Sequence, residues 1–258
     1  ERAQNIDSLA GKILRINTDG TGPADNPFFD GNPNSNRSKV YAYGFRNMYR
    51  FNFHPSTGFL YGGDVGWDTW EELNRILPGG NYGWPCREGN FAAEGQTCVA
   101  SSPLDPLYAY IHDLFIGGAV TSGAFPTAYP AEYANTMFFG DFALNFIKTI
   151  NVGPSGTEAV VADFMNGADG ADGPVDFEVG PEGYVYYISI YSGEVRRINY
   201  TLGNRQPILQ ITATPQSGLS PLAVAFSSVG SSDPDGDTLS YEWGFGDGGA
   251  STLANPTH

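Results

Sequence analysis

Basic residues, histidines and cysteines are all scarce in this sequence of 258 residues, and each scarcity narrows the function classes. Only 13 lysine and arginine residues stand against 28 aspartate and glutamate residues, which gives a formal net charge of −15. Such a charge repels polyphosphates and anionic membrane surfaces, so no nucleic-acid partner is expected. No apolar run reaches the roughly 18 residues that a spanning helix needs, so no membrane span is expected either.

The only two cysteines, Cys86 and Cys98, flank a short glycine-containing loop. A structural metal site normally needs four ligands, which two cysteines cannot supply. Disulfides persist in oxidising compartments. The spacing therefore favours a local disulfide, and a disulfide in turn favours an extracellular or periplasmic location.

Glycine and proline are abundant, with 34 and 18 residues, and they fall between short apolar segments. This punctuation is typical of many short strands joined by tight turns. The 41% hydrophobic content allows a sizeable core, in one large domain or two smaller ones. The sequence therefore predicts an all-β fold without long helices.

A repeated pattern organises most of the chain. Strand, short turn and second strand recur in four segments, three of which end in Ile-Asn: residues 11–17, 58–76, 136–151 and 183–199. The pattern favours stacked propeller blades, with a generic β-sandwich as the alternative. Only three to four blades can be counted. Because a propeller normally closes with at least four, we expect upstream blades or a partner chain to complete the ring.

The sequence changes character near residue 204, where the polar, proline-ended run GNRQP precedes three new alternating segments. Period-two alternation and frequent turns favour a small sandwich. The sequence stops before the last strands that such a sandwich needs. We therefore expect two domains, residues 1–203 and 204–258, with the second one incomplete.

Two long motifs carry a family resemblance: YGFRNMYRFNF at 43–53 and GDVGWDTWEELNRILPGGNYGWPCREG at 63–89. Together with weaker matches over residues 8–200, they resemble the glucose/sorbosone dehydrogenase family of quinone-dependent six-bladed propellers. WGFGDG at 243–248 resembles the motif of polycystic-kidney-disease (PKD) domains. The resemblance implies an all-β fold: part of a six-bladed β-propeller, followed by an incomplete immunoglobulin-like β-sandwich.

The resemblance also implies a cofactor and a metal. In the family, an Arg-Asn pair at the mouth of the central pocket contacts pyrroloquinoline quinone (PQQ), and here the pair is Arg46 and Asn47. Family members bind calcium through two consecutive backbone carbonyls, which here belong to Gly66 and Trp67. Trp67 stands where the best-known members have proline, a change that leaves the carbonyl in place. A turn-capping role for Arg46 and Asn47 is the alternative.

No catalytic residue is assigned within the chain. The histidine that serves the family as general base belongs to a motif upstream of residues 11–17, so this chain alone is expected not to oxidise sugar. His54 and His112 are expected to be structural. Glu71 and Glu72 are adjacent on a predicted strand, so their side chains point to opposite faces and cannot form a carboxylate dyad.

The charge pattern leaves two functions open. Family members place basic residues of the last blades against the PQQ carboxylates, but residues 140–146 and 172–183 contain none. One interpretation is a fragment of a secreted sugar dehydrogenase that oxidises aldoses at C1, with sugar or glycan as partner. The other is a non-catalytic extracellular scaffold, adhesion or glycan-binding protein built on the same propeller.

Overall fold

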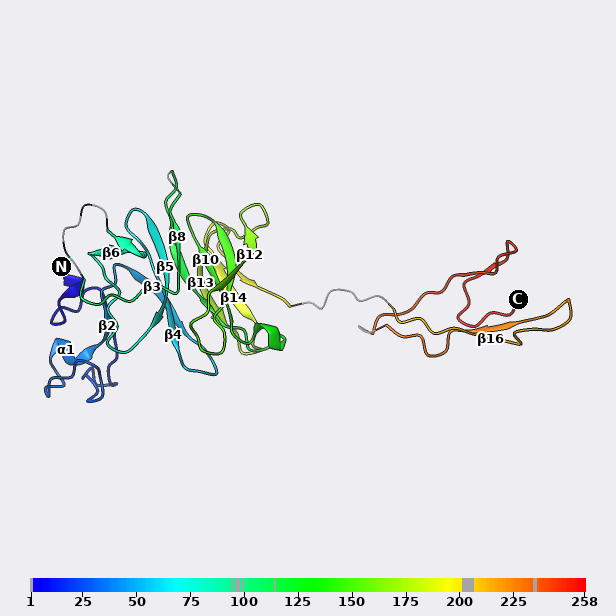
Figure 1. Cartoon of the computed structure of the whole chain (residues 1–258), viewed down its shortest axis with the longest axis horizontal. Coiled ribbons are helices and arrows are strands. Elements are labelled where there is room, and N and C mark those ends of the chain that lie inside the picture. Colours follow the sequence, from blue (N-terminus) through cyan, green and yellow to red (C-terminus); the bar gives the residue numbers. More distant parts are fainter. Residues whose placement is uncertain are drawn as a thin grey trace. The chain divides into compact units, whose positions relative to one another are not determined.

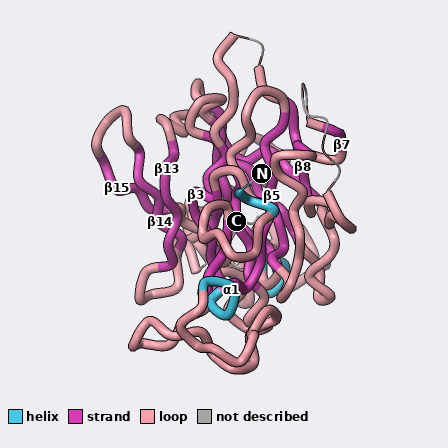
Figure 2. The backbone as a smooth tube through the Cα atoms, turned by 90° about the vertical axis from the view of Figure 1, so that its left-hand side faces the viewer, coloured by secondary structure: helices cyan, strands magenta, loops and turns pink. Residues whose placement is uncertain are grey.

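The chain divides into two compact units, residues 1–199 and 200–258, each described by itself (Figure 1). The computed structural model describes residues 2–93, 95, 98, 100–113, 115–200, 207–233 and 236–258. Residues 203–206 of the predicted linker GNRQP lie outside the described residues. Strands are the main regular secondary structure of the chain, and the described helices are single turns (Figure 2).

Two four-stranded antiparallel sheets and one three-stranded sheet form most of the first unit. The strand orders in these sheets are β3-β4-β5-β8, β9-β10-β11-β12 and β13-β14-β15. A two-stranded sheet, β1-β2, precedes them in the chain. The bounds are β1 Lys12–Leu14, β2 Val40–Tyr43, β3 Met48–Phe53, β4 Leu60–Asp64, β5 Trp70–Ile76, β8 Tyr108–Ile111, β9 Val120–Ala124, β10 Thr136–Asp141, β11 Phe146–Asn151, β12 Val160–Asn166, β13 Pro174–Val179, β14 Val185–Ser189 and β15 Glu194–Arg197.

The sequence repeat maps onto these sheets. Its segments supply β4-β5, β10-β11 and β14-β15, the second and third strands of successive sheets. The first segment supplies β1, so by the repeat β1-β2 corresponds to the third and fourth strands of another blade. The inner strand β9 lies next to both β3 and β13, as the first strands of successive propeller blades do. The expected all-β, partial-propeller fold is confirmed.

Apolar layers between neighbouring sheets hold the blades together. Strand β10 is buried along its whole length, with Met137 and Phe139 on one face and Phe138 on the other. This follows from period-two alternation in a strand whose both faces pack on neighbours. Three core clusters result, around Phe45 and Ile76, around Phe139 and Ile150, and around Phe138 and Phe177.

The first unit also contains short helices and strands outside the main sheets. They are η1 Arg2–Gln4, α1 Asn36–Lys39, η2 Ala131–Tyr133, β6 Arg87–Glu88 and β7 Phe91–Ala92. Strands β6 and β7 form a small antiparallel hairpin inside the loop between β5 and β8. No described helix is long and apolar enough to cross a membrane.

The second unit contains two small hairpins, β16-β17 and β18-β19. Their bounds are β16 Thr212–Thr214, β17 Ala225–Ser227, β18 Trp243–Gly244 and β19 Ala250–Ser251. Phe226 packs against both Trp243 and Phe245, and the Trp243 indole N–H donates to the Leu253 carbonyl at 2.8 Å. The WGFGDG motif thus supplies the aromatic centre of this unit.

Candidate functional site

A cavity of about 280 Å³ lies where the three inner strands meet. Its walls are mainly apolar and come from β3, from the start of β9 and from β13. The lining residues are Asn47, Tyr49, Val65, Ala119, Val120, Thr121, Phe142, Val175 and Ile190. Of the sequence-predicted site residues, Asn47 lines the cavity directly.

A buried carboxylate joins the Arg-Asn motif to the end of β4. The Asp64 carboxylate accepts the backbone N–H groups of Arg46 at 3.0 Å and Asn47 at 2.7 Å. Burial raises the pKa of Asp64 to about 6, although these two hydrogen bonds oppose the shift. Because Asp64 ends β4 and Gly66 follows two residues later, this contact brings the predicted cofactor pair and the predicted calcium turn together.

The Arg46 side chain lies on the same turn. Its guanidinium donates to the Val65 carbonyl at 2.9 Å and stands 5.8 Å from the centre of the Trp84 ring. Trp67 in turn meets Trp84 edge-on, with ring centres 5.5 Å apart, and its side chain is 55% exposed. A cation and two indole rings therefore border the turn, where a flat or anionic ligand could contact them.

The turn at residues 66–70, which contains the predicted calcium ligands Gly66 and Trp67, directs its backbone N–H groups at two buried carboxylates. Oε1 of Glu88 accepts from residues 67, 68, 69 and 70 at 2.7–3.1 Å. Oε1 of Glu71 accepts from Gly66 at 3.2 Å. Among the described residues, no hydrogen-bond donor reaches the carbonyl oxygens of Gly66 and Trp67.

These two carbonyls suit calcium. Calcium is a hard cation that takes main-chain carbonyl oxygens readily, and no donor in the described part of the chain competes for the carbonyl of the buried residue Gly66. The described residues contain no cluster of three or more His, Cys, Asp or Glu side chains that could hold a metal. A site here therefore depends on backbone oxygens.

Glu71 connects the turn to the cavity wall and to a histidine. Its Oε2 accepts the Val120 N–H at 2.8 Å, and its Oε1 lies 2.6 Å from Nε2 of His112. Burial raises the pKa of Glu71 to about 8. Glu72 has different partners, accepting from Asn74 and from the Gly89 N–H. The two glutamates thus bind separate parts of the fold, and no carboxylate dyad forms.

His54 and His112 both make hydrogen bonds within the first unit. His54 is buried, and its Nδ1 accepts the backbone N–H groups of Ser56 and Thr57 at 3.3 Å each. Burial lowers the pKa of His54 and so favours its neutral form. His112 is bound to Glu71 as described above. Neither histidine lines the cavity.

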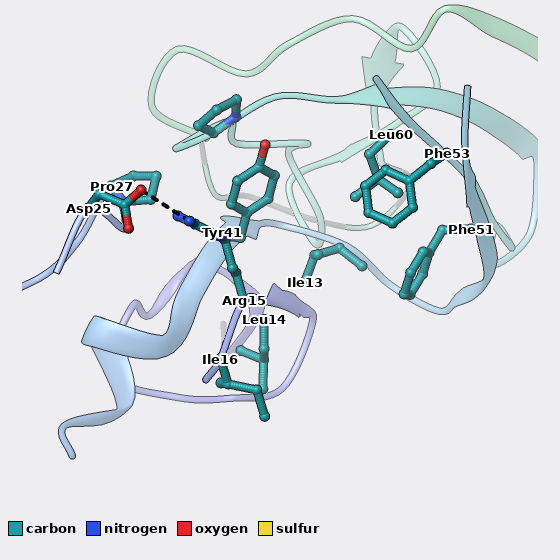
Figure 3. Close-up of a pocket in the computed structure, with 11 residues that line it drawn as sticks. Ile13, Leu14, Arg15, Ile16, Asp25, Pro27, Tyr41, Phe51, Phe53 and Leu60 are labelled. Atoms are coloured by element: carbon teal, nitrogen blue, oxygen red, sulfur yellow. Dashed lines mark hydrogen bonds and ion pairs between the residues drawn. The ribbon is translucent and has the colours of Figure 1, made fainter. Parts of the chain in front are cut away.

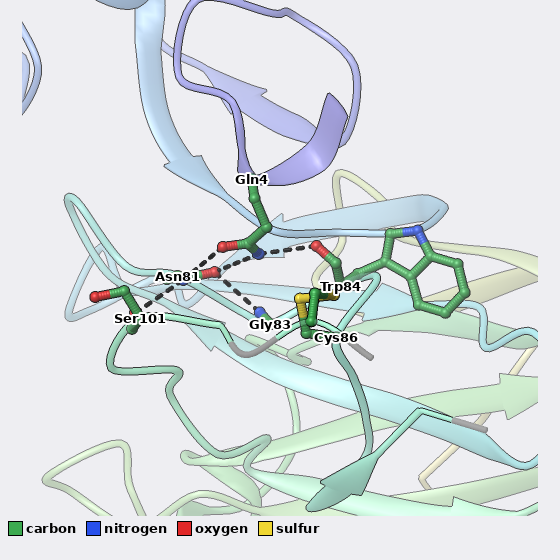
Figure 4. The surroundings of a disulfide bond; sticks show 7 residues. Gln4, Asn81, Gly83, Trp84, Cys86 and Ser101 are labelled. Carbon is green, nitrogen blue, oxygen red and sulfur yellow. Dashed lines mark hydrogen bonds between the residues drawn. A yellow bond between two sulfur atoms is a disulfide. The ribbon is translucent and has the colours of Figure 1, made fainter. Parts of the chain in front are cut away.

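The disulfide between Cys86 and Cys98 is present, as expected (Figure 4). Beside it, the Asn81 side chain exchanges hydrogen bonds with Gln4 at 2.9 Å, and Gln4 also donates to the Trp84 carbonyl at 2.8 Å. The loop closed by the disulfide carries Glu88, which connects this covalent link to the turn at residues 66–70.

Comparison with known proteins assigns the family. The family model described as Glucose / Sorbosone dehydrogenase matches residues 1–197. The chain belongs to the glucose/sorbosone dehydrogenase family. A PKD-domain model matches residues 204–258, so a PKD domain follows the propeller blades. Both recognised modules agree with the resemblance drawn from the motifs.

Relatives in this family include named sugar dehydrogenases. Quinoprotein glucose dehydrogenase B of Acinetobacter calcoaceticus is 44% identical over 133 residues, covering 50% of this chain and 25% of its own. Aldose sugar dehydrogenase YliI of Escherichia coli is 26% identical over 206 residues, covering 76% and 53%. The solved PQQ-bound aldose sugar dehydrogenase of Streptomyces coelicolor is 27% identical, with a TM-score of 0.54 and coverage of 72% and 48%. The chain spans about half the length of such relatives or less.

The sequence analysis did not predict two residues of the site, Glu88 and Asp141. Glu88 follows the NYGWPC loop with no pattern that marks it as a partner of residues 67–70, because the contact spans about twenty residues and depends on how the β6 hairpin folds back. Asp141, fully buried, accepts from the Tyr110 hydroxyl at 2.6 Å and the Ala119 N–H at 2.9 Å. Its signal was a carboxylate ending an otherwise apolar strand, β10.

Proposed function

We propose that this chain is the part of a PQQ-dependent sugar dehydrogenase that binds the quinone and calcium, in a protein that oxidises aldoses at C1. One observation carries the proposal. The Asp64 carboxylate holds the backbone of Arg46 and Asn47 just before the turn whose Gly66 and Trp67 carbonyls receive no donor among the described residues, and Asn47 lines the apolar cavity. That combination offers hydrogen-bond donors to a flat quinone and carbonyl oxygens to a calcium ion beside it.

When bound, PQQ would accept hydride from the sugar and calcium would act on the quinone as a Lewis acid. The residues of this chain would supply binding and orientation. Arg46 is placed to donate to quinone or carboxylate oxygens, and the Asn47 amide is placed to orient the ring. Tyr49, Phe142 and Ile190 would pack against its faces.

The fit to the PQQ carboxylates is incomplete. None of the described residues that line the cavity is charged. Two cations contact lining residues: Arg46 donates to the Val65 carbonyl, and the Arg50 guanidinium stands 4.5 Å from the centre of the Tyr49 ring, whereas PQQ carries three carboxylates. Burial raises the pKa of Glu71 to about 8, so this carboxyl is mostly protonated near neutral pH, whereas Asp64, whose pKa burial raises to about 6, stays mostly ionised. Calcium would supply further positive charge.

We assign no proton acceptor within the chain. Abstraction of the C1 hydroxyl proton needs a base within hydrogen-bond reach of the sugar. His54 and His112 are both engaged elsewhere in the fold. The base is therefore expected from blades that complete the ring, and the chain by itself is expected not to turn over sugar.

We further propose that additional blades or a partner chain cover the open edge of the propeller, and that the protein works outside the cytoplasm. Exposed apolar side chains on β3 support the first point, Phe51 at 49% and Phe53 at 59%. The disulfide supports the second, since such bonds persist in oxidising compartments. The acidic charge and the following PKD domain are compatible with a secreted enzyme.

Calorimetric titration of the folded chain with PQQ, in calcium and again in chelator, tests the proposal. We expect binding in calcium and its loss in chelator. Absence of binding in both conditions, with circular dichroism showing folded protein, would contradict a cofactor-binding role for this part of the protein.

The second candidate is a non-catalytic extracellular scaffold or glycan-binding protein on the same propeller. Its support is the uncharged cavity wall, which provides no basic clamp for a tricarboxylate. Under this alternative, PQQ fails to bind, while glycan-array binding is retained when Arg46 is replaced.

A further inference from the structure

The turn at residues 66–70 has an unusual distribution of hydrogen bonds. All five of its backbone N–H groups point at buried carboxylates, four of them at the single oxygen Oε1 of Glu88. Neither carboxylate belongs to a residue of the turn: Glu71 lies on β5, and Glu88 lies on the β6-β7 hairpin. The amide side of the turn is therefore fully occupied.

Peptide geometry then determines where the carbonyls point. In a trans peptide the C=O of one residue is antiparallel to the N–H of the next. None of the cis peptides among the described residues falls in this turn. Because the N–H groups of Trp67 and Asp68 point at Glu88, the C=O groups of Gly66 and Trp67 point away from it. No described donor reaches either of these two carbonyls.

The electrostatics of Glu88 agree with an anchoring role. Oε1 of Glu88 accepts four backbone N–H groups at 2.7–3.1 Å, and hydrogen bonds to a carboxylate are charge-assisted and of the stronger kind. Gly66 adds a steric constraint, since a Cβ there would lie 1.7 Å from the Trp70 carbonyl oxygen.

We propose that Glu88 is a positioning residue of the calcium site: by holding the amides of residues 67–70, its carboxylate directs the carbonyls of Gly66 and Trp67 toward the metal. The inference rests on the proposed function, which puts calcium at these carbonyls. Glu88 acts through the backbone and does not itself contact the ion.

Two substitutions separate positioning from simple charge. Glu88→Gln and Glu88→Ala remove the same charge, but glutamine keeps a carbonyl oxygen that can accept from the turn. If position matters, the alanine variant loses more calcium affinity than the glutamine variant. If only charge matters, the two variants lose the same amount, and the loss shrinks at high ionic strength.

The experiment is a calorimetric titration of the full chain, freed of metal with chelator, with calcium chloride alone. We expect the affinity of one site to fall at least tenfold in Glu88→Ala and about threefold in Glu88→Gln. Glu182→Gln, at an exposed carboxylate on another blade, is the matched control and should leave the affinity unchanged. Any calcium bound by the PKD domain is common to all variants.

Terbium(III) emission excited through indole gives a second, local readout, because Trp67 supplies one of the two carbonyls. The emission should fall in the same order as the calcium affinity. Unchanged calcium affinity in both folded Glu88 variants would overturn the positioning role and leave the calcium site standing. A wild-type chain that binds no calcium would remove the site and this inference together. Should Glu88→Ala fail to fold, the Glu88→Gln titration at low and high ionic strength decides, since an unchanged affinity, or a loss that disappears at high ionic strength, overturns the role.

Discussion

Arg46 is the residue on which cofactor binding is expected to depend most. Its guanidinium already donates to the Val65 carbonyl and has the Trp84 ring nearby, so it is held at the edge of the cavity before any ligand arrives. A prepositioned guanidinium loses less freedom on binding than a free side chain does. Replacing Arg46 therefore removes both a charge and a fixed donor geometry.

We expect Arg46→Ala to weaken PQQ binding in calcium by about tenfold to a hundredfold, the range of a hydrogen bond to a charged group. Arg46→Lys should recover only part of this loss, because a lysine ammonium cannot reproduce the planar fork. Calorimetry measures both. An Arg46→Ala variant that binds as tightly as wild type would favour the turn-capping interpretation of this residue.

Glu72 is a buried carboxyl whose ionisation should destabilise the fold. Burial raises its pKa to about 8, against 4.5 for the free side chain. The folded state therefore holds the proton more tightly than the unfolded state. The stabilisation is complete below about pH 4.5 and is lost as the pH rises toward 8, at a rate on the order of 1.4 kcal/mol per pH unit for one carboxyl.

Glu72→Gln should flatten this decline, because the amide keeps an acceptor for the Gly89 N–H and cannot ionise. Denaturant unfolding measured at pH 5, 6.5 and 8 provides the comparison. The variant should be more stable than wild type at pH 8, and the difference should shrink at pH 5. Parallel curves for the two proteins would show that Glu72 does not carry the pH dependence.

At the scale of elements, the loop between β5 and β8 does more than connect two strands. It carries the β6-β7 hairpin, the disulfide, and both Glu88 and Gly89, whose contacts return to β5 and to the turn before it. The covalent link therefore closes the loop from which Glu88 reaches the turn.

Replacing both cysteines by serine is expected to lower the free energy of unfolding of the first unit by about 3 kcal/mol, the chain-entropy value for a loop of this length. Calcium affinity should fall as well, since the hairpin that carries Glu88 loses its tether. Denaturant melts and calcium titrations of the double variant check the two effects. Wild-type protein under reducing conditions should behave like the variant, and unchanged calcium affinity in either sample would show that the tether is dispensable for the site.

The elements also show how far the sequence could predict this structure. The blade strands followed from a repeat whose apolar periodicity is local, and strand β10 reads as buried because apolar residues are continuous along it. The contact between Arg46 or Asn47 and Asp64 was within reach, since family motifs placed both near one pocket. Glu88 was not, because its four hydrogen bonds depend on how a hairpin folds back across the sheet, which no local pattern encodes.

At the scale of the whole molecule, the edge of the propeller blades near β1 and β3 remains open. A groove of about 640 Å³ runs along it, with Ile13, Phe51, Phe53 and Leu60 on its walls (Figure 3). The Arg15–Asp25 ion pair, 3.0 Å long, lies at its rim. Soluble proteins seldom leave contiguous apolar surface of this kind uncovered unless something binds there.

The open edge leads to a prediction for the chain as it stands. It should bind the hydrophobic dye ANS while fully folded and should associate as its concentration rises, because the groove buries apolar area whenever it finds a partner surface. Replacing Phe51 and Phe53 by serine should reduce both effects with a small change in unfolding free energy, since both side chains are already about half exposed.

Val160→Ser is the matched control, because Val160 is an exposed apolar residue, 66% exposed, on the outer strand of another blade and outside the groove. Dye fluorescence and light scattering over a concentration series, with circular dichroism for folding, distinguish the three proteins. If Val160→Ser reduces dye binding and association as much as the double variant, the effect comes from general surface hydrophobicity. If only the double variant does so, the groove is the surface responsible for both effects, as expected if additional blades or a partner chain cover its apolar walls.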